Sequence, residues 1–193
     1  MLKDEFTEFV SEKLRSFKYK NLSGMEDFKR SSVIMPLFLD NGIPHMLLTL
    51  RTEKVKDHQR QISFPGGTLK ENEPLLETAL RELYEEIGVR KDEVKILGEL
   101  DEIFTLTYYR IKPYVGFIDY PREFNISRDE IEELIFVRIE DLLKKENFRK
   151  EIKGNFLGEP YPVYFFTIGD INIWGATAKI IKNFLEVVYN WKE

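Results

Sequence analysis

Three glutamates and an arginine lie close together in the run Arg81–Glu86. Residues three or four positions apart share one face of a helix, so Glu82, Glu85 and Glu86 are predicted to lie on or near the same face. Like charges at this spacing destabilise a helix by roughly 0.2–0.5 kcal/mol per pair, and a bound divalent cation would remove that repulsion. The pattern therefore indicates a metal site, and a solvated helix face with ion pairs is the alternative.

A Pro-Gly-Gly turn precedes the acidic run, and its glycines are Gly66 and Gly67. Glycine allows backbone conformations and close approaches that a side chain would forbid. Mg²⁺ takes oxygen ligands and leaves positions free for substrate phosphates. A bent loop that delivers backbone groups beside these carboxylates therefore predicts a combined metal and phosphate site, with Gly66 and Gly67 in contact with substrate.

The spacing of these residues resembles one family pattern throughout. Gly67, Glu73, the run Arg81–Glu86 and the pair Gly88-Val89 fit the Nudix box, G-x5-E-x7-R-E-U-x-E-E-x-G-U with U a bulky aliphatic residue, without a mismatch. The box occupies residues 67–89. The resemblance implies a hydrolase of nucleoside diphosphates linked to another group. It also implies an α/β fold, the Nudix α/β/α sandwich, in which helices flank a mixed β-sheet.

The resemblance implies a role for each residue of the box. Glu82, Glu85 and Glu86 would be ligands of Mg²⁺ or Mn²⁺, and the carbonyl of Gly67 would be a further ligand. Arg81 would orient the glutamates through charge-assisted hydrogen bonds, which completes the predicted catalytic set of Arg81, Glu82, Glu85 and Glu86. Glu73 stays open between a supporting role and a direct one.

The general base is not identified by the sequence. A helix carboxylate or a carboxylate from a neighbouring loop could serve. Candidates outside the helix are Glu99, Asp101 and Glu102, and a solvated acidic cluster is the simpler interpretation of these three.

A second resemblance narrows the substrate. The segment Leu47–Thr52, then His58 and Gln61, then Phe64–Gly67 resemble the signature of coenzyme A pyrophosphatases, as do two later segments, Gly98–Thr105 and Ile173–Ile181. Such enzymes split coenzyme A into adenosine 3′,5′-bisphosphate and 4′-phosphopantetheine. The implied partner is a small nucleotide, and the resemblance is compatible with a homodimer.

Three positions depart from that signature: Thr52 replaces serine, Lys56 replaces arginine and Arg60 replaces glycine. Arg60 either binds a substrate phosphate or stands where a glycine would serve the shape of the backbone. Arg51, Lys56 and Arg60 belong to a basic loop in an acidic protein, so we interpret them as substrate-binding residues; a solvated loop is the alternative. Tyr108 and Tyr109 could stack on adenine, whereas Trp174 is expected in the core.

Composition limits the other possibilities. The chain has 193 residues, a formal net charge of −5 and no cysteine, which argues against general affinity for nucleic acid and against disulfides or thiolate chemistry. No apolar run is long enough to span a membrane and no signal segment is apparent, so a cytoplasmic protein is expected. We predict one domain over residues 1–193.

The elements that must position the site follow from hydrophobic periodicity. Helices are expected over residues about 3–17, 74–87 and about 174–191, and Gly88 should end the second of them. Strands are expected over residues 32–39 and 46–50, joined by a turn at Asp40–Gly42. Further strands are expected over residues 94–107, 111–118, 134–137 and 161–168.

Two other functions compete with cleavage of coenzyme A. One is hydrolysis of another dinucleotide, such as ADP-ribose or NADH. The other is a non-catalytic nucleotide-binding regulator, against which stands the complete set of carboxylates in the box.

Overall fold

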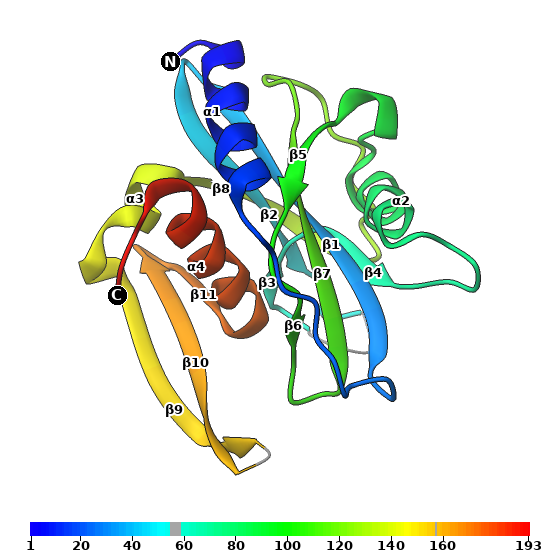
Figure 1. Cartoon of the computed structure of the whole chain (residues 1–193). Helices are drawn as coiled ribbons and strands as arrows, with labels where there is room; N and C mark the ends of the chain where they lie inside the picture. The colour runs from blue at the N-terminus through cyan, green and yellow to red at the C-terminus, as the bar shows by residue number, and fades with distance from the viewer. Residues whose placement is uncertain (55–58, 157) are drawn as a thin grey trace.

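The computed structural model describes residues 1–54, 59–156 and 158–193, and a mixed β-sheet forms its centre (Figure 1). The strands follow the order β3-β2-β1-β7-β5, while β4 pairs with β1, β6 with β7 and β8 with β2. Their bounds are β1 Lys29–Asp40, β2 Ile43–Arg51, β3 Ile62–Ser63, β4 Gly66–Thr68, β5 Lys95–Glu99, β6 Ile103–Phe104, β7 Tyr109–Phe117 and β8 Ile131–Arg138.

Helices cover both faces of this sheet, with α2 on one side and α1 and α4 on the other (Figure 1). Their bounds are α1 Lys3–Ser16, α2 Leu75–Ile87, α3 Ile139–Leu143 and α4 Gly175–Tyr189, with single 3-10 turns η1 Lys91–Glu93 and η2 Lys145–Asn147. The predicted fold class, a mixed sheet flanked by helices, is confirmed.

The alternation of side chains along β1 creates the two layers. Ile34 and Phe38 belong to the core beneath α2, while Met35 and Leu37 belong to the core beneath α1 and α4. Successive side chains of a strand point to opposite faces, so an apolar run such as this one is buried on both sides. β1 therefore lies between the two helical layers.

Strand β1 also fixes the mixed pairing of the sheet. It runs antiparallel to β2 and parallel to β7. The turn between β1 and β2 has a positive φ at both Asn41 (48°) and Gly42 (77°), which is the backbone of a tight hairpin turn. The turn predicted at Asp40–Gly42 is thus confirmed.

A second, three-stranded sheet consists of β9 Phe148–Phe156, β10 Glu159–Ile168 and β11 Ile171–Trp174. The hairpin of β9 and β10 extends away from the central sheet, while β11 leads directly into α4 (Figure 1). β9 was not expected, because its residues are largely exposed and show little hydrophobic alternation.

The single strand predicted over residues 94–107 is wrong, because the chain leaves the sheet between β5 and β6. Asp101 and Glu102 there accept hydrogen bonds from the backbone N–H groups of Lys20 and Leu22, at 2.6 and 2.8 Å. Glu102 is buried and forms an ion pair of 2.6 Å with Arg110. The interpretation of these carboxylates as a solvated cluster is also wrong, because their hydrogen bonds hold the segment that follows α1 in place.

Among the residues that the structure describes, no helix is both long and apolar enough to cross a membrane.

Candidate functional site

Helix α2 places two adjacent glutamates in opposite environments. Its apolar stripe, which includes Ala79, Leu83 and Ile87, is fully buried against the sheet. Because consecutive residues of a helix are about 100° apart, the side chain of Glu85 is 47% exposed while that of Glu86 is 2% exposed. The helix therefore offers one carboxylate to solvent and inserts the next into the protein.

Glu86 is the carboxylate of the site whose pKa burial raises most strongly. Burial raises its pKa to about 8, although the nearby guanidinium of Arg51 acts in the opposite direction and the charges of Glu82 and Glu130 reinforce the rise. Nη1 of Arg51 lies 3.4 Å from Oε1 of Glu86. The Oε2 atom of Glu86 and the Nε atom of Arg51 are buried without a hydrogen-bond partner among the described residues. A buried carboxylate oxygen with a free lone pair is a site for a cation or a donor.

Arg81 joins the other acidic residues of the box. Its Nε and Nη2 atoms donate to the two carboxylate oxygens of Glu73, at 2.8 and 3.1 Å. Its Nη1 atom donates to Glu82 at 2.6 Å and to Glu85 at 2.8 Å. The hydrogen bonds from Arg81 lower the pKa of Glu73 to about 2, against the ordinary value of 4.5. Glu73 thus anchors Arg81, and Arg81 holds two helix carboxylates in position.

This arrangement makes the stabilising effect of Glu73 depend on pH. The folded pKa lies below the unfolded one, so the contribution of Glu73 is present above about pH 4.5 and is lost as the pH falls through 2. We expect Glu73→Gln to lower the free energy of unfolding by about 2 kcal/mol at pH 7 and by much less near pH 2. Denaturant unfolding across this range, with exposed Glu71→Gln as the control, measures it. An equal deficit at every pH would contradict the assignment.

Different neighbouring atoms leave no room for a side chain at each of the two glycines of the turn. A Cβ atom at Gly66 would stand 2.7 Å from the Cα atom of Val33 and would also collide with the carbonyl oxygen of Ser32. A Cβ atom at Gly67 would stand 2.5 Å from Oε1 of Glu82. Gly66 therefore allows β4 to pair with β1, and Gly67 allows the carboxylate of Glu82 to lie directly on the backbone.

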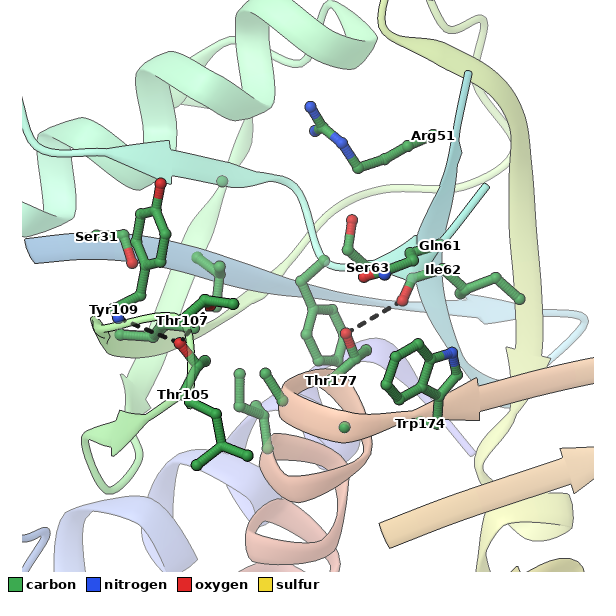
Figure 2. Close-up of a pocket in the computed structure, with 18 of the residues that line it drawn as sticks. Ser31, Arg51, Gln61, Ile62, Ser63, Thr105, Thr107, Tyr109, Trp174 and Thr177 are labelled. Carbon is green, nitrogen blue, oxygen red and sulfur yellow. Dashed lines mark hydrogen bonds between the residues drawn. The ribbon is translucent and has the colours of Figure 1, made fainter. Parts of the chain in front are cut away.

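A cavity of about 510 Å³ opens beside this glycine pair (Figure 2). Arg51, Gly66 and Gly67 line one part of it. The rest of the lining includes residues of β1, β3 and β7, of the segment between β6 and β7, of β10 and of the first turn of α4. Figure 2 shows Ser31 and Tyr109 on one side of the view and Trp174 and Thr177 on the other. The acidic helix and a ligand-sized cavity therefore meet at Arg51 and the glycines.

The NUDIX domain family matches residues 28–156, which is more than half of the chain. The chain belongs to the Nudix family. The match extends well beyond the box, from β1 to the end of β9.

Named Nudix proteins resemble the chain over most of its length. Nudix hydrolase 3 of Caenorhabditis elegans is 31% identical over 152 residues, which is 77% of this chain and 63% of that protein. Nudix hydrolase 15, mitochondrial, of Arabidopsis thaliana is 32% identical over 169 residues, or 83% of this chain and 59% of that protein. The chain thus spans less than two thirds of these two relatives.

Solved structures agree on the fold. A MutT/nudix family protein from Enterococcus faecalis superposes with a TM-score of 0.53 at 19% identity, over 98% of this chain and 75% of that one. An Ap4A hydrolase binary complex from C. elegans superposes with a TM-score of 0.50 at 17% identity, over 60% and 83% of the two chains. At this level of identity the likeness concerns the Nudix fold alone.

The structure brings some of the expected Nudix site residues together and separates others. Arg51, Gly66 and Gly67 line the cavity, and Glu86 lies next to Arg51. Glu85 faces solvent beside Lys70, 3.7 Å away. Lys56 and His58 lie outside the described residues.

Arg60 does not line this cavity. Its Nη1 atom lies 3.5 Å from both Glu53 and Glu132, and its side chain borders a neighbouring hollow. Its backbone has a φ of 54°, in the left-handed region that glycine adopts without strain. The contacts of Arg60 therefore favour the interpretation that it stands where a glycine would serve the shape of the backbone, over the interpretation that it binds a substrate phosphate.

Sequence reasoning missed most of the cavity wall. The side chain of Trp174, expected in the core, is 45% exposed and lines the cavity, because Trp174 has an extended backbone just before the first turn of α4. Tyr161 and Thr177 also line it, from elements far away in sequence. In the sequence, only the resemblance over Ile173–Ile181 pointed to this part of the wall. Hydrophobic periodicity could not have found it, because periodicity shows only whether a helix face is apolar.

Nudix hydrolases generally use a divalent ion such as Mg²⁺ or Mn²⁺, and the carboxylates of the box are its candidate ligands here. In the described part of the chain, no three acidic or histidine side chains converge as a ready cation site, because Arg81 lies between Glu82 and Glu85. The donors themselves fit: they are carboxylate oxygens, which these ions prefer, and Oε2 of Glu86 is buried without a partner among the described residues. The assignment of Glu82, Glu85, Glu86 and Gly67 as ligands stays a prediction.

Proposed function

We propose that this chain is a divalent-metal-dependent Nudix pyrophosphohydrolase that cleaves the diphosphate of coenzyme A or of its acyl derivatives. The observation that carries the proposal is that Arg51, which lines the cavity together with Gly66 and Gly67, pairs with buried Glu86 of the acidic helix. It brings an acidic helix, a guanidinium and a pair of glycines to one place, which is what a metal-bound diphosphate needs.

The residues divide the chemical work according to their contacts. Glu82, Glu85 and Glu86 would hold the metal, which when bound neutralises diphosphate oxygens and lowers the pKa of a water molecule. Arg81 keeps Glu82 and Glu85 in place through its hydrogen bonds. It is therefore a positioning residue and does not line the cavity.

Arg51 faces both the helix and the cavity. Its side chain lines the cavity, where a guanidinium can donate charge-assisted hydrogen bonds to a phosphate oxygen. In hydrolysis, water adds across one P–O bond of the diphosphate, with its OH on one phosphorus and its hydrogen on the oxygen that leaves. With coenzyme A the products are adenosine 3′,5′-bisphosphate and 4′-phosphopantetheine.

A substrate panel tests the proposal. We expect Mg²⁺- or Mn²⁺-dependent cleavage of coenzyme A and acyl-coenzyme A, with kcat/KM about tenfold or more above that for ADP-ribose and NADH. Chromatography of the two phosphomonoester products measures it, and the double variant Glu85→Gln plus Glu86→Gln serves as the inactive control. Cleavage of ADP-ribose without cleavage of coenzyme A would replace the substrate. Nucleotide binding without any cleavage would indicate a regulator.

A further inference from the structure

The cavity has an uneven distribution of charge. Among its described lining residues only Arg51 is ionised at neutral pH, and it lies at the part where Gly66 and Gly67 also line the wall. The remaining walls are hydroxyl, aliphatic and aromatic side chains, with one amide. A phosphate group buried away from Arg51 would thus lose its hydration without gaining a cation, which is strongly unfavourable.

Two hydroxyl groups of the walls away from Arg51 already use their protons. Thr177 donates to the carbonyl of Ile62 at 3.1 Å, and Tyr161 donates to the carbonyl of Phe104 at 3.4 Å. A hydroxyl whose proton is engaged in this way presents its oxygen to a ligand as an acceptor. Phosphate oxygens are acceptors too, so these walls suit a ligand that carries N–H or O–H donors.

One lysine lies near these walls without entering the cavity. Nζ of Lys179 lies 4.8 Å from the ring centre of Phe104 and 5.9 Å from that of Tyr161, and burial lowers its pKa. Lys179 does not line the cavity. Its charge therefore meets aromatic faces and gives no direct contact to a phosphate inside.

We propose that this cavity binds the uncharged, amide-bearing arm of the substrate, so that coenzyme A enters with its pantetheine half and leaves its 3′-phosphorylated nucleotide half outside. The assignment rests on the proposed function. Pantetheine carries two amide N–H groups and hydroxyl groups on an aliphatic chain, which matches acceptor oxygens set among apolar walls. The diphosphate then lies at Arg51 and the glycines, next to α2.

The indole of Trp174 can report the occupant directly. It lines the cavity and is 45% exposed, whereas Trp191, the other tryptophan of the chain, is 8% exposed. Figure 2 shows Trp174 beside Ile62 and Thr177, across the view from Tyr109. A ligand in the cavity changes the surroundings of Trp174 and with them its fluorescence.

The experiment titrates the metal-free full chain with pantetheine, adenosine and adenosine 3′,5′-bisphosphate, each alone and in competition. We expect pantetheine to change the emission saturably in the wild type and not in Trp174→Phe. Adenosine 3′,5′-bisphosphate should not displace it. Displacement by adenosine or by the bisphosphate, or no binding of pantetheine, would overturn the assignment.

A variant of the wall sharpens the test. Thr177→Val keeps the shape of the side chain and removes its acceptor oxygen, so it should weaken pantetheine binding about fivefold. Exposed Thr167→Val, in β10 but outside the cavity lining, should leave binding unchanged. Equal affinity for pantetheine in the wild type and in Thr177→Val would contradict the assignment of the Thr177 oxygen as an acceptor for the ligand.

Failure of this assignment differs from failure of the proposed function. If coenzyme A is cleaved but pantetheine does not bind in the cavity, only the orientation is wrong. If pantetheine binds at Trp174 but coenzyme A is not cleaved, the cavity assignment stands and the catalytic proposal fails.

Discussion

Glu86→Gln is expected to lower kcat for coenzyme A hydrolysis by about 10³-fold, because it removes a buried negative charge that would hold the metal beside Arg51. Glutamine has nearly the shape of glutamate, and burial already disfavours the charged form of Glu86. The folded structure should therefore survive the change. Steady-state kinetics measures the loss, and Mn²⁺ binding followed by electron paramagnetic resonance should weaken in parallel.

Glu77→Gln is the matched control for this variant. Glu77 lies on the same helix, its side chain is 48% exposed, and it pairs with Lys91 at 3.5 Å, away from the cavity lining. It should retain wild-type kcat and Mn²⁺ affinity. Wild-type turnover in folded Glu86→Gln would remove Glu86 from the proposed site.

Replacing Gly66 and Gly67 by alanine, one at a time, should affect different properties of the protein: stability at Gly66 and catalysis at Gly67. At Gly66 the new methyl group meets backbone atoms of β1, which cannot move without breaking the pairing of β4 with β1. We expect Gly66→Ala to lower the free energy of unfolding by about 3 kcal/mol.

At Gly67 the methyl group meets the end of the Glu82 side chain, which can turn away. We expect Gly67→Ala to fold and to lose kcat about 10²-fold, through displacement of that carboxylate.

Thermal unfolding and kinetics of both variants check this pair. A combined variant, Gly67→Ala with Glu82→Ala, relieves the contact and should regain stability but not activity. If Gly67→Ala keeps full activity, Glu82 does not act from the position seen here. If Gly66→Ala unfolds like the wild type, the backbone contact with Val33 is relieved by a small shift of β4.

The acidic helix could be predicted from sequence because its determinants are local. An apolar residue every three or four positions defines the buried stripe, and Gly88 ends the helix with the left-handed φ of 75° that glycine accepts. The same local reasoning placed the hairpin of β1 and β2. It failed at residues 94–107, because hydrogen bonds from Lys20 and Leu22 to Asp101 and Glu102 take the chain out of the sheet.

Residues of similar type received different surroundings that no local pattern encodes. Arg51 and Arg60 belong to the same basic stretch, yet Arg51 lies beside buried Glu86 while Arg60 pairs with Glu53 and Glu132. Charge and spacing identify such groups, and packing against other elements decides which of them is desolvated.

The family, the acidic helix and the layered α/β fold could all be predicted from the sequence, because the Nudix box and hydrophobic periodicity are short-range patterns. The position of the cavity and the distribution of charge around it depend on how distant elements pack together. Its walls come from β1, β4, β7, β10 and α4, whose residues meet only when the two sheets and the last helix pack together. That packing brings exposed Trp174 into the lining of the same cavity as Gly66 and Gly67, which lie more than a hundred residues earlier in the chain.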